Sequence, residues 1–311
     1  MLNDIYQALD PVAFTIGPFS VRWYGIAYVL GFVCAAIVVW RTARRWKIRV
    51  DADALCTIML CVIIGIILGA RLGYVVFYGD GYYWEHPAKI LAINEGGMSF
   101  HGGLIGALLS GIVAAKLTGI PYLTLADLGC IAAPIGLFFG RIANFINGEL
   151  WGSVTDLPWG VVFGGSAGDL PRHPSQLYEA FLEGIVIFVV LYALSRKRRR
   201  VPTGGSFQTG TGAALVDVRR SQPLPRGTFL GLFLIMYGVF RILIEFVREP
   251  DAQLGYLWGG WLTMGQVLSA PLVVVGVIVL VYAIKMKKPQ QGLPGQPLDP
   301  EGHYYNRTMY Q

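Results

Sequence analysis

Three polar side chains fall at the end of one apolar run, on one face of the helix that the run predicts. The run begins near Leu125, and Arg141, Asn144 and Asn147 follow at intervals of three residues. At about 100° per residue these three share an arc of about 120°. A guanidinium inside a membrane costs about 2.5–3.5 kcal/mol on insertion scales, so we expect a partner or ligand for it. With Glu149 close behind, the stretch predicts a polar pocket for an anion.

A second polar group lies on one face of another predicted helix. Tyr237, Arg241, Glu245 and Arg248 are spaced four, four and three residues apart. A salt bridge between Arg241 and Glu245 would explain two of them through helix packing and would leave Arg248 spare. Two arginines with a carboxylate between them suit a phosphate group better. The spacing therefore favours a phosphate site, with the packing pair as the alternative.

His101 stands in the glycine-rich stretch Gly96–Gly103, which begins a third apolar run. A helix N-terminus presents free N–H groups to an anion, and imidazole titrates near neutral pH. The residue is therefore a candidate for a general base or for a hydrogen-bond donor to the anion. Close helix packing is a further explanation of the glycines. No cluster of metal-ligand residues at metal spacing is seen, so we expect neither a metal nor a cofactor.

The elements that must position these residues are membrane helices. Of the 311 residues 54% are hydrophobic and 14% are charged, whereas soluble domains carry about 25% charged residues. All four cysteines lie inside apolar runs and are interpreted as packing residues. We predict an all-α polytopic membrane protein with seven transmembrane helices. The predicted spans are Trp23–Trp40, Ala54–Tyr78, Gly97–Ala115, Leu125–Ile146, Leu177–Leu194, Thr228–Phe246 and Leu262–Ile284.

Basic residues gather in alternate loops and so predict the orientation. They occupy Arg41–Arg49, Arg196–Arg200, Lys116 and Lys285–Lys288. The positive-inside rule then places the N-terminus outside and the C-terminus in the cytoplasm. The net charge of +6 is confined to such short blocks, which favours lipid headgroups as partners and gives no support for nucleic acid.

We expect residues 1–288 to form one integral membrane domain. Within it, Gly148–Pro174 is expected to be a small outer cap loop, because it is rich in Gly and contains Trp. Val201–Arg226 is expected to be a flexible cytoplasmic loop. The polar tail Pro289–Gln311 has little to bury and is expected to be disordered in the cytoplasm.

With this orientation, six of the seven predicted spans carry polar residues at the outer depth, which predicts one shared site that faces outward. These residues are Tyr24, Arg71, His101, Arg141, Asn144, Glu179, Glu183, Tyr237, Arg241, Glu245 and Arg248. A lipid or anion transporter would need polar residues at the inner depth too, where Asp127 is one of few. A lipid-linked phosphotransferase would need Asp-rich metal motifs, which the sequence lacks. Both remain as alternatives.

The stretch Gly140–Gly152, with the sequence GRIANFINGELWG, resembles the signature of the bacterial prolipoprotein diacylglyceryl transferases. Further stretches that are similar to motifs of this family are Trp23–Gly25, Gly96–Gly103, Arg172–Glu179 and Tyr237–Arg248. The similarity runs from about Pro11 to Ile284. Relative to the family, the loop Val201–Arg226 is long and the loop Gly148–Pro174 is short.

The resemblance implies an enzyme of the bacterial inner (cytoplasmic) membrane with its active site on the periplasmic side. Such enzymes transfer diacylglyceryl from phosphatidylglycerol to the thiol of a lipobox cysteine in a signal-peptide-bearing prolipoprotein. They form a thioether and release glycerol phosphate, which is the first step of lipoprotein maturation. The catalytic residues would be His101, Arg141, Arg241 and Tyr24. Substrate would be bound by Asn144, Asn147, Glu149, Gly152, Tyr237, Glu245 and Arg248.

Overall fold

The computed structural model describes residues 1–79, 81–93, 96–202, 219–250 and 255–294. The chain divides into two compact units, each described by itself below. The first unit consists of Met1–Thr42 and Asp127–Pro289, and the second consists of Ala43–Ala126 and Gln290–Gln311.

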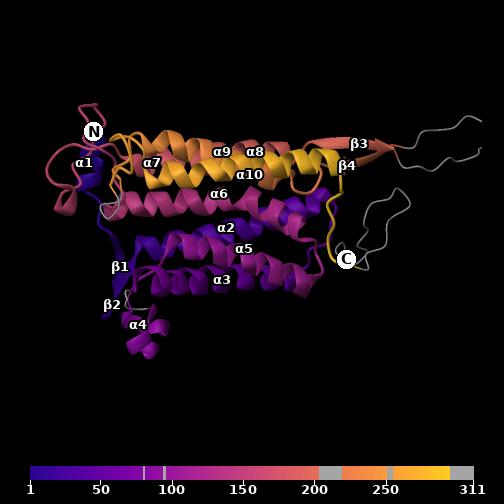
Figure 1. The fold of residues 1–311 in the computed structure, drawn as a ribbon, viewed down its shortest axis with the longest axis horizontal. Coiled ribbons are helices and arrows are strands. Elements are labelled where there is room, and N and C mark those ends of the chain that lie inside the picture. The colour runs from indigo at the N-terminus through magenta and orange to yellow at the C-terminus, as the bar shows by residue number, and fades with distance from the viewer. Residues whose placement is uncertain (80, 94–95, 203–218, 251–254, 295–311) are drawn as a thin grey trace, which may run out of the picture. The chain divides into compact units, whose positions relative to one another are not determined.

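Most of the first unit is helical, with two short hairpins. Its elements are α1 (Leu2–Gln7), β1 (Val12–Ile16), β2 (Phe19–Arg22), α2 (Trp23–Trp46, through Thr42), α6 (Tyr122–Asn147, from Asp127), η3 (Gly165–Ala167), α7 (Ser175–Glu179), the π-helical η4 (Ala180–Val186), α8 (Ile187–Leu194), β3 (Arg198–Pro202), β4 (Arg219–Pro223), α9 (Thr228–Glu245) and α10 (Met264–Met286). Helices α7, η4 and α8 run on without a break, so that α7 lies at one end of the bundle and the β3–β4 hairpin at the other (Figure 1).

The second unit is built on a pair of helices, and their ends are capped by side chains. Its elements are α3 (Ala52–Tyr78), α4 (Tyr82–Glu85), η1 (Pro87–Leu91) and α5 (Phe100–Thr118). Asp51 accepts a hydrogen bond from the N–H of Ala54 at 3.0 Å, and Ser99 accepts one from that of Gly102 at 3.2 Å. Each cap satisfies a backbone donor that the first turn of a helix leaves free.

The protein is an all-α polytopic membrane protein, as predicted. Within the described part of the chain, six helices are long and apolar enough to cross a membrane, and a shorter apolar helix covers Gly102–Thr118. In the most apolar 18-residue window of each long span, between 11% and 39% of the residues are buried, so most residues of these windows are at least partly accessible to lipid. All seven predicted runs are therefore helical. The number of seven crossings and the direction of the termini stay predictions.

Glycines bring helices together within each unit. A Cβ atom on Gly102 of α5 would lie 2.2 Å from the carbonyl oxygen of Gly69 in α3. One on Gly231 of α9 would lie 2.9 Å from the carbonyl oxygen of Gly276 in α10. Such backbone contacts replace the side-chain layer that normally separates helices. Close packing, which the sequence left as one explanation of the glycines near His101, therefore holds for Gly102.

The two antiparallel hairpins were not predicted from the sequence. In the first, Thr15 pairs with Ser20 across a turn at Gly17, whose φ of +58° suits glycine. In the second, Arg200 pairs with Ser221. Strands β3 and β4 flank residues 203–218, so most of the predicted flexible loop lies outside the described residues.

The predicted disordered tail is described in part. From Gln290 onward it belongs to the second unit, where the N–H of Leu293 donates to the carbonyl oxygen of Arg49 at 3.0 Å. The side chain of Gln290 is buried there as well. Residues 295–311 lie outside the described part of the chain, so the prediction of disorder is not tested.

A buried carboxylate aligns α6 with α9. Asp127 of α6 is fully buried and accepts hydrogen bonds from the N–H groups of Gly227 (2.7 Å) and Leu230 (2.8 Å) at the start of α9. It thereby caps a helix whose own N-cap residue is a glycine without a side chain. Arg141 and Arg241 each stand 14 residues beyond this contact, about 21 Å along their helices. The cap therefore brings the two arginines to one level.

Candidate functional site

The first unit holds a buried cluster of three arginines and three glutamates, which we call the ion network. The side chains of the arginines are 10% to 14% exposed, and those of the glutamates are 0% to 3% exposed. They come from α6, α7, η4, α9 and the residues just after α9. The members of the ion network are Arg141, Arg241, Arg248, Glu179, Glu183 and Glu245.

Glu179 is the centre of the ion network. Its Oε2 atom lies 2.9 Å from Nε of Arg141, and its Oε1 atom accepts a hydrogen bond from Nη1 of Arg241. Nε of Arg248 lies 3.8 Å from the same Oε1. One carboxylate at the start of the fifth predicted span thus draws together the arginines of two different helices.

Glu245 forms the second point of contact. Its Oε1 atom lies 2.6 Å from Nη2 of Arg241 and accepts a hydrogen bond from Nη1 of Arg248 at 3.2 Å. Its Oε2 atom accepts a hydrogen bond from Oγ1 of Thr263 at 2.5 Å. The salt bridge between Arg241 and Glu245 is therefore present. The packing alternative does not leave Arg248 spare, because Arg248 pairs with the same carboxylate one turn further on.

The ion network is balanced in formal charge, with three positive and three negative groups. Removing one partner of a buried pair costs about 3–5 kcal/mol, because the other charge is left without compensation. Guanidinium groups also offer paired N–H donors that match a phosphate. A phosphate bound here would compete with the glutamates for the same donors, and in the structure the glutamates hold the arginines in position.

The predicted asparagines serve Glu149. Nδ2 of Asn144 and Nδ2 of Asn147 both donate to Oε1 of Glu149, at 2.8 Å and 3.3 Å. Nε2 of Gln176 donates to the backbone oxygen of Glu149 at 2.6 Å. Tyr24 of α2 is close enough for the charges of Arg141 and Glu149 to act on its hydroxyl, which also shares a hydrogen bond with Tyr28. These residues form a second polar group beside the ion network.

Gly152 has a packing role in the structure. Its N–H donates to the backbone oxygen of His173 at 2.8 Å, and it pairs with Arg248 in an isolated bridge. A Cβ atom here would lie 2.4 Å from the backbone oxygen of Val247 and 2.6 Å from Cβ of His173. Only a glycine fits between these segments, so the predicted outer loop is fastened to the end of α9. Substrate binding by Gly152 stays a prediction.

The remaining predicted residues have different placements. Tyr237 lies on α9 one turn before Arg241, with its ring stacked on Phe233 at 5.8 Å between centroids. His101 lies in α5 of the second unit, and its side chain is outside the described part of the structure. Its two predicted roles stay predictions.

Arg71 of the second unit does not need an anion as partner. Its guanidinium donates to the backbone oxygens of four residues at 2.5–3.0 Å, which hold the segment between α3 and α5. These acceptors are Lys89, Ile90, Gly96 and Gly97. The residue that the sequence placed at the outer depth therefore has a structural explanation.

Sequence reasoning placed Glu179 and Glu183 at the depth of the site and gave them no role. The sequence did contain a signal for such a role, because placing a carboxylate inside a membrane span costs free energy and therefore marks a functional site. The charge count was a second signal, since three arginines and Glu245 leave two positive charges to be balanced. Among the described residues, no group of three or more His, Cys, Asp or Glu has the arrangement to hold a metal ion.

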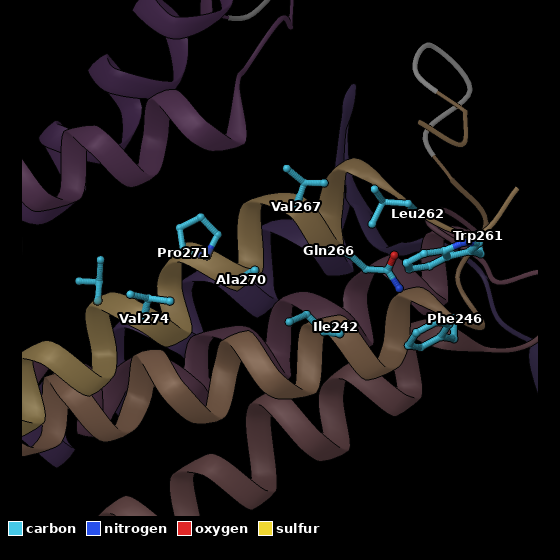
Figure 2. Close-up of a pocket in the computed structure, with 10 residues that line it drawn as sticks. Ile242, Phe246, Trp261, Leu262, Gln266, Val267, Ala270, Pro271 and Val274 are labelled. Carbon is cyan, nitrogen blue, oxygen red and sulfur yellow. The ribbon is translucent and has the colours of Figure 1, made fainter. Parts of the chain in front are cut away.

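An apolar groove lies beside the ion network, at the start of α10. It has a volume of about 800 Å³, and its side chains come from the end of α9, from α10 and from the segment before α10 (Figure 2). Gln266, its polar member, forms a capping box with Thr263, the residue that donates to Glu245. Its apolar members include Ile242, Phe246, Trp261, Val267 and Pro271.

We expect Gly184→Ala to lower activity strongly, because this glycine lets η4 approach α6. A Cβ atom on Gly184 would lie 2.7 Å from Cβ of Phe138 and 2.9 Å from its Cα, so the helix that carries Glu179 and Glu183 would be pushed away from Arg141. Misplacing catalytic groups by about 1 Å can cost about 100-fold in rate. The measurement is the initial rate of the diacylglyceryl transfer that the family resemblance implies, with thermal unfolding in detergent as a check of folding.

Gly129→Ala in α6 is the matched control. An added Cβ atom there meets nothing within 4 Å, so we expect an unchanged rate and a slightly more stable helix. Equal rates for the two variants would contradict the packing argument.

Comparison with known proteins identifies the family of the chain. The family model for prolipoprotein diacylglyceryl transferase matches residues 11–282. A phosphatidylglycerol–prolipoprotein diacylglyceryl transferase of Geobacter sulfurreducens is 45% identical over 282 residues, which are 91% of this chain and 98% of the relative. Proteins of the same name from Methylocella silvestris and Pseudomonas paraeruginosa are 45% and 43% identical, each over 90% of this chain and 96% of the relative. The chain therefore belongs to the prolipoprotein diacylglyceryl transferase family.

Proposed function

We propose that this chain is an enzyme that transfers diacylglyceryl from phosphatidylglycerol to the lipobox cysteine of a prolipoprotein. The product is a thioether, glycerol phosphate is released, and the reaction begins lipoprotein maturation. The observation that carries the proposal is the ion network, in which three arginines from α6, α9 and the residues just after α9 share buried glutamates. Family membership supports it independently.

The chemistry explains the need for several arginines. The cysteine sulfur forms a bond to the terminal glyceryl carbon of the lipid, and the bond from that carbon to the phosphate oxygen breaks. The phosphate gains one negative charge as it leaves. Arg141 and Arg241 would neutralise the growing charge, with Arg248 beside them, because each guanidinium can donate two parallel hydrogen bonds. Stabilisation of this kind accelerates the step without a covalent enzyme intermediate.

The thiol must also lose a proton before it attacks. A free cysteine has a pKa of about 8.5, so at neutral pH a base or a positive field has to favour the thiolate. His101 is proposed as that base, and Tyr24 and Glu149 are proposed to orient the headgroup or the peptide. The asparagines that bond to Glu149 keep its carboxylate fixed. The groove beside Thr263 would receive an acyl chain, because its lining is apolar and lies next to the phosphate site.

The proposed location is the bacterial inner membrane, with the site on the periplasmic side and residues 1–288 as one membrane domain. The basic loops support this orientation. Single cysteines in a cysteine-free background test it. We expect an impermeant thiol reagent to label Asp169→Cys in intact cells, and to label Ser221→Cys only after permeabilisation. Both positions are exposed. The reverse pattern would overturn the orientation.

The activity itself is tested with doubly labelled phosphatidylglycerol and a lipobox peptide. We expect the acyl label to move to the peptide and the headgroup label to appear as free glycerol phosphate. A peptide with serine in place of the lipobox cysteine is the control and should stay unlabelled. Movement of intact lipid across the membrane would instead favour a transporter, and phosphate on the acceptor would favour a phosphotransferase.

A further inference from the structure

Glu183 differs from the other glutamates of the ion network in having no hydrogen bond. Its side chain is fully buried, and within the described residues neither carboxylate oxygen has a hydrogen-bond donor. The ion-pair contact recorded for it is Nη2 of Arg141 at 3.7 Å, which is too long for a hydrogen bond. By contrast, Glu179 and Glu245 both accept hydrogen bonds from Arg241 or its neighbours.

A buried carboxylate that has no hydrogen-bond donor within the protein indicates a ligand that supplies the donors. An ionised carboxylate accepts at about four positions and offers no donor. Buried polar atoms in proteins are nearly always satisfied, and an exception needs an explanation such as a site that is filled by substrate. Because Glu183 sits in a π-helical turn, its position is also one at which local helix geometry is often adapted to function.

The neighbour of Glu183 indicates which donors these are. Under the proposed function, Arg141 holds the phosphate of phosphatidylglycerol. The headgroup beyond that phosphate is a glycerol with two free hydroxyl groups on adjacent carbons. Glu183 and Glu179 both contact Arg141, at 3.7 Å and 2.9 Å, but Glu179 accepts a hydrogen bond from Arg241 at Oε1, whereas both oxygens of Glu183 are without a donor among the described residues. Two adjacent hydroxyl groups can each donate to one oxygen of a single carboxylate.

We propose that Glu183 binds the two hydroxyl groups of the glycerol headgroup and so selects phosphatidylglycerol as donor. This inference rests on the proposed function and adds the residue that determines its lipid specificity. The diol belongs to the leaving group, so the contact also holds the phosphate in line while the carbon–oxygen bond breaks. A headgroup without hydroxyls gives the buried carboxylate of Glu183 no hydrogen-bond donor, and such a lipid is a poor substrate for that reason.

The test compares two donor lipids that differ in these hydroxyls alone. Phosphatidylpropanol has the same phosphodiester and acyl chains as phosphatidylglycerol, and it lacks both hydroxyl groups. Each is presented in mixed micelles with the same lipobox peptide, and kcat/KM is measured for each. For the wild type we expect phosphatidylglycerol to be favoured by about 100-fold or more, since two hydrogen bonds to a charged acceptor are lost.

The variant Glu183→Gln assigns the preference to the residue. The amide keeps the size of the side chain but loses the charge and one acceptor, so we expect the ratio of the two kcat/KM values to fall to about 10-fold or less. Glu249→Gln is the matched control, because it makes the same chemical change at a carboxylate outside the ion network. The control should keep the wild-type ratio. Because the readout is a ratio within one preparation, partial misfolding cancels.

Three results would overturn the proposal while leaving the function intact. One is a wild type that uses both lipids equally well, and this comparison needs no variant. A second is an unchanged ratio in Glu183→Gln with both rates lowered together, which would make Glu183 a structural residue. The third is efficient use of phosphatidylethanolamine by the wild type, which would show that the carboxylate selects a cation. If the wild type transfers nothing from phosphatidylglycerol, the proposed function itself fails.

Discussion

Replacing Arg241 by alanine is expected to lower the rate of diacylglyceryl transfer by about 100- to 1,000-fold. The variant removes charge stabilisation from the leaving phosphate, and contacts of this kind are commonly worth about 2.7–4 kcal/mol in the transition state. Arg141→Ala should have an effect of similar size. Arg241→Lys should recover only part of the loss, because an ammonium group cannot supply two parallel hydrogen bonds. The measurement is kcat/KM with labelled phosphatidylglycerol and a lipobox peptide.

The ion network allows the effect on chemistry to be separated from an effect on folding. Arg241 bonds to both Glu179 and Glu245, so its removal leaves one buried negative charge in excess and should destabilise the protein by about 3–5 kcal/mol. The double variant Arg241→Ala with Glu179→Gln restores the balance of charge. We expect it to recover much of the thermal stability in detergent and none of the activity.

Arg196→Ala is the control for this series. Arg196 is exposed just beyond α8, at the end of the bundle opposite the ion network, and we expect an unchanged rate. A well-folded Arg241→Ala protein with the wild-type rate would exclude Arg241 from the stabilisation of the leaving group.

The helices of this protein could be predicted because their signal is local. In a run of about 20 apolar residues, the backbone N–H and C=O groups must form their hydrogen bonds within the segment, which makes the run a helix. The predicted span Ala54–Tyr78 accordingly differs from α3 by only two residues. Spacing along one helix is equally local. The intervals between Tyr237, Arg241 and Glu245 therefore predicted one face correctly, and the ion pair between Arg241 and Glu245 was rightly kept as an alternative.

The contacts that complete the site are not local, so they could not be ranked from the order of residues alone. Glu179 meets Arg141 from 38 positions away, through a helix approach that depends on Gly184. The β1–β2 and β3–β4 hairpins depend on pairing between strands, which composition does not record. The guanidinium of Arg71 donates its hydrogen bonds to backbone carbonyl oxygens. Because every residue has such an oxygen, the sequence does not indicate which ones it will contact. Partners of this kind become visible only in three dimensions.

The general base is expected to be revealed by the pH dependence of the variant His101→Gln. If His101 accepts the proton of the thiol, it must be neutral, so the wild-type rate should rise with pH through the pKa of the imidazole. The variant should lose this rise and about 100- to 10,000-fold in rate. Headgroup affinity should change little. If His101 instead donates a hydrogen bond to phosphate, glutamine can replace it, and the shape of the pH profile should survive.

His173 is the matched histidine for this experiment, because it belongs to the same unit as the ion network. It lies outside the membrane spans, and Nδ1 of its ring shares a hydrogen bond with Oη of Tyr178 at 3.2 Å. Partial burial lowers the pKa of its imidazole, which favours the neutral form that a base requires. A rise in rate that it controlled would have its midpoint below the ordinary value of about 6.5. Persistence of the rise in His101→Gln and its loss in His173→Gln would move the role to His173, whereas the opposite pair of results would assign the base to His101.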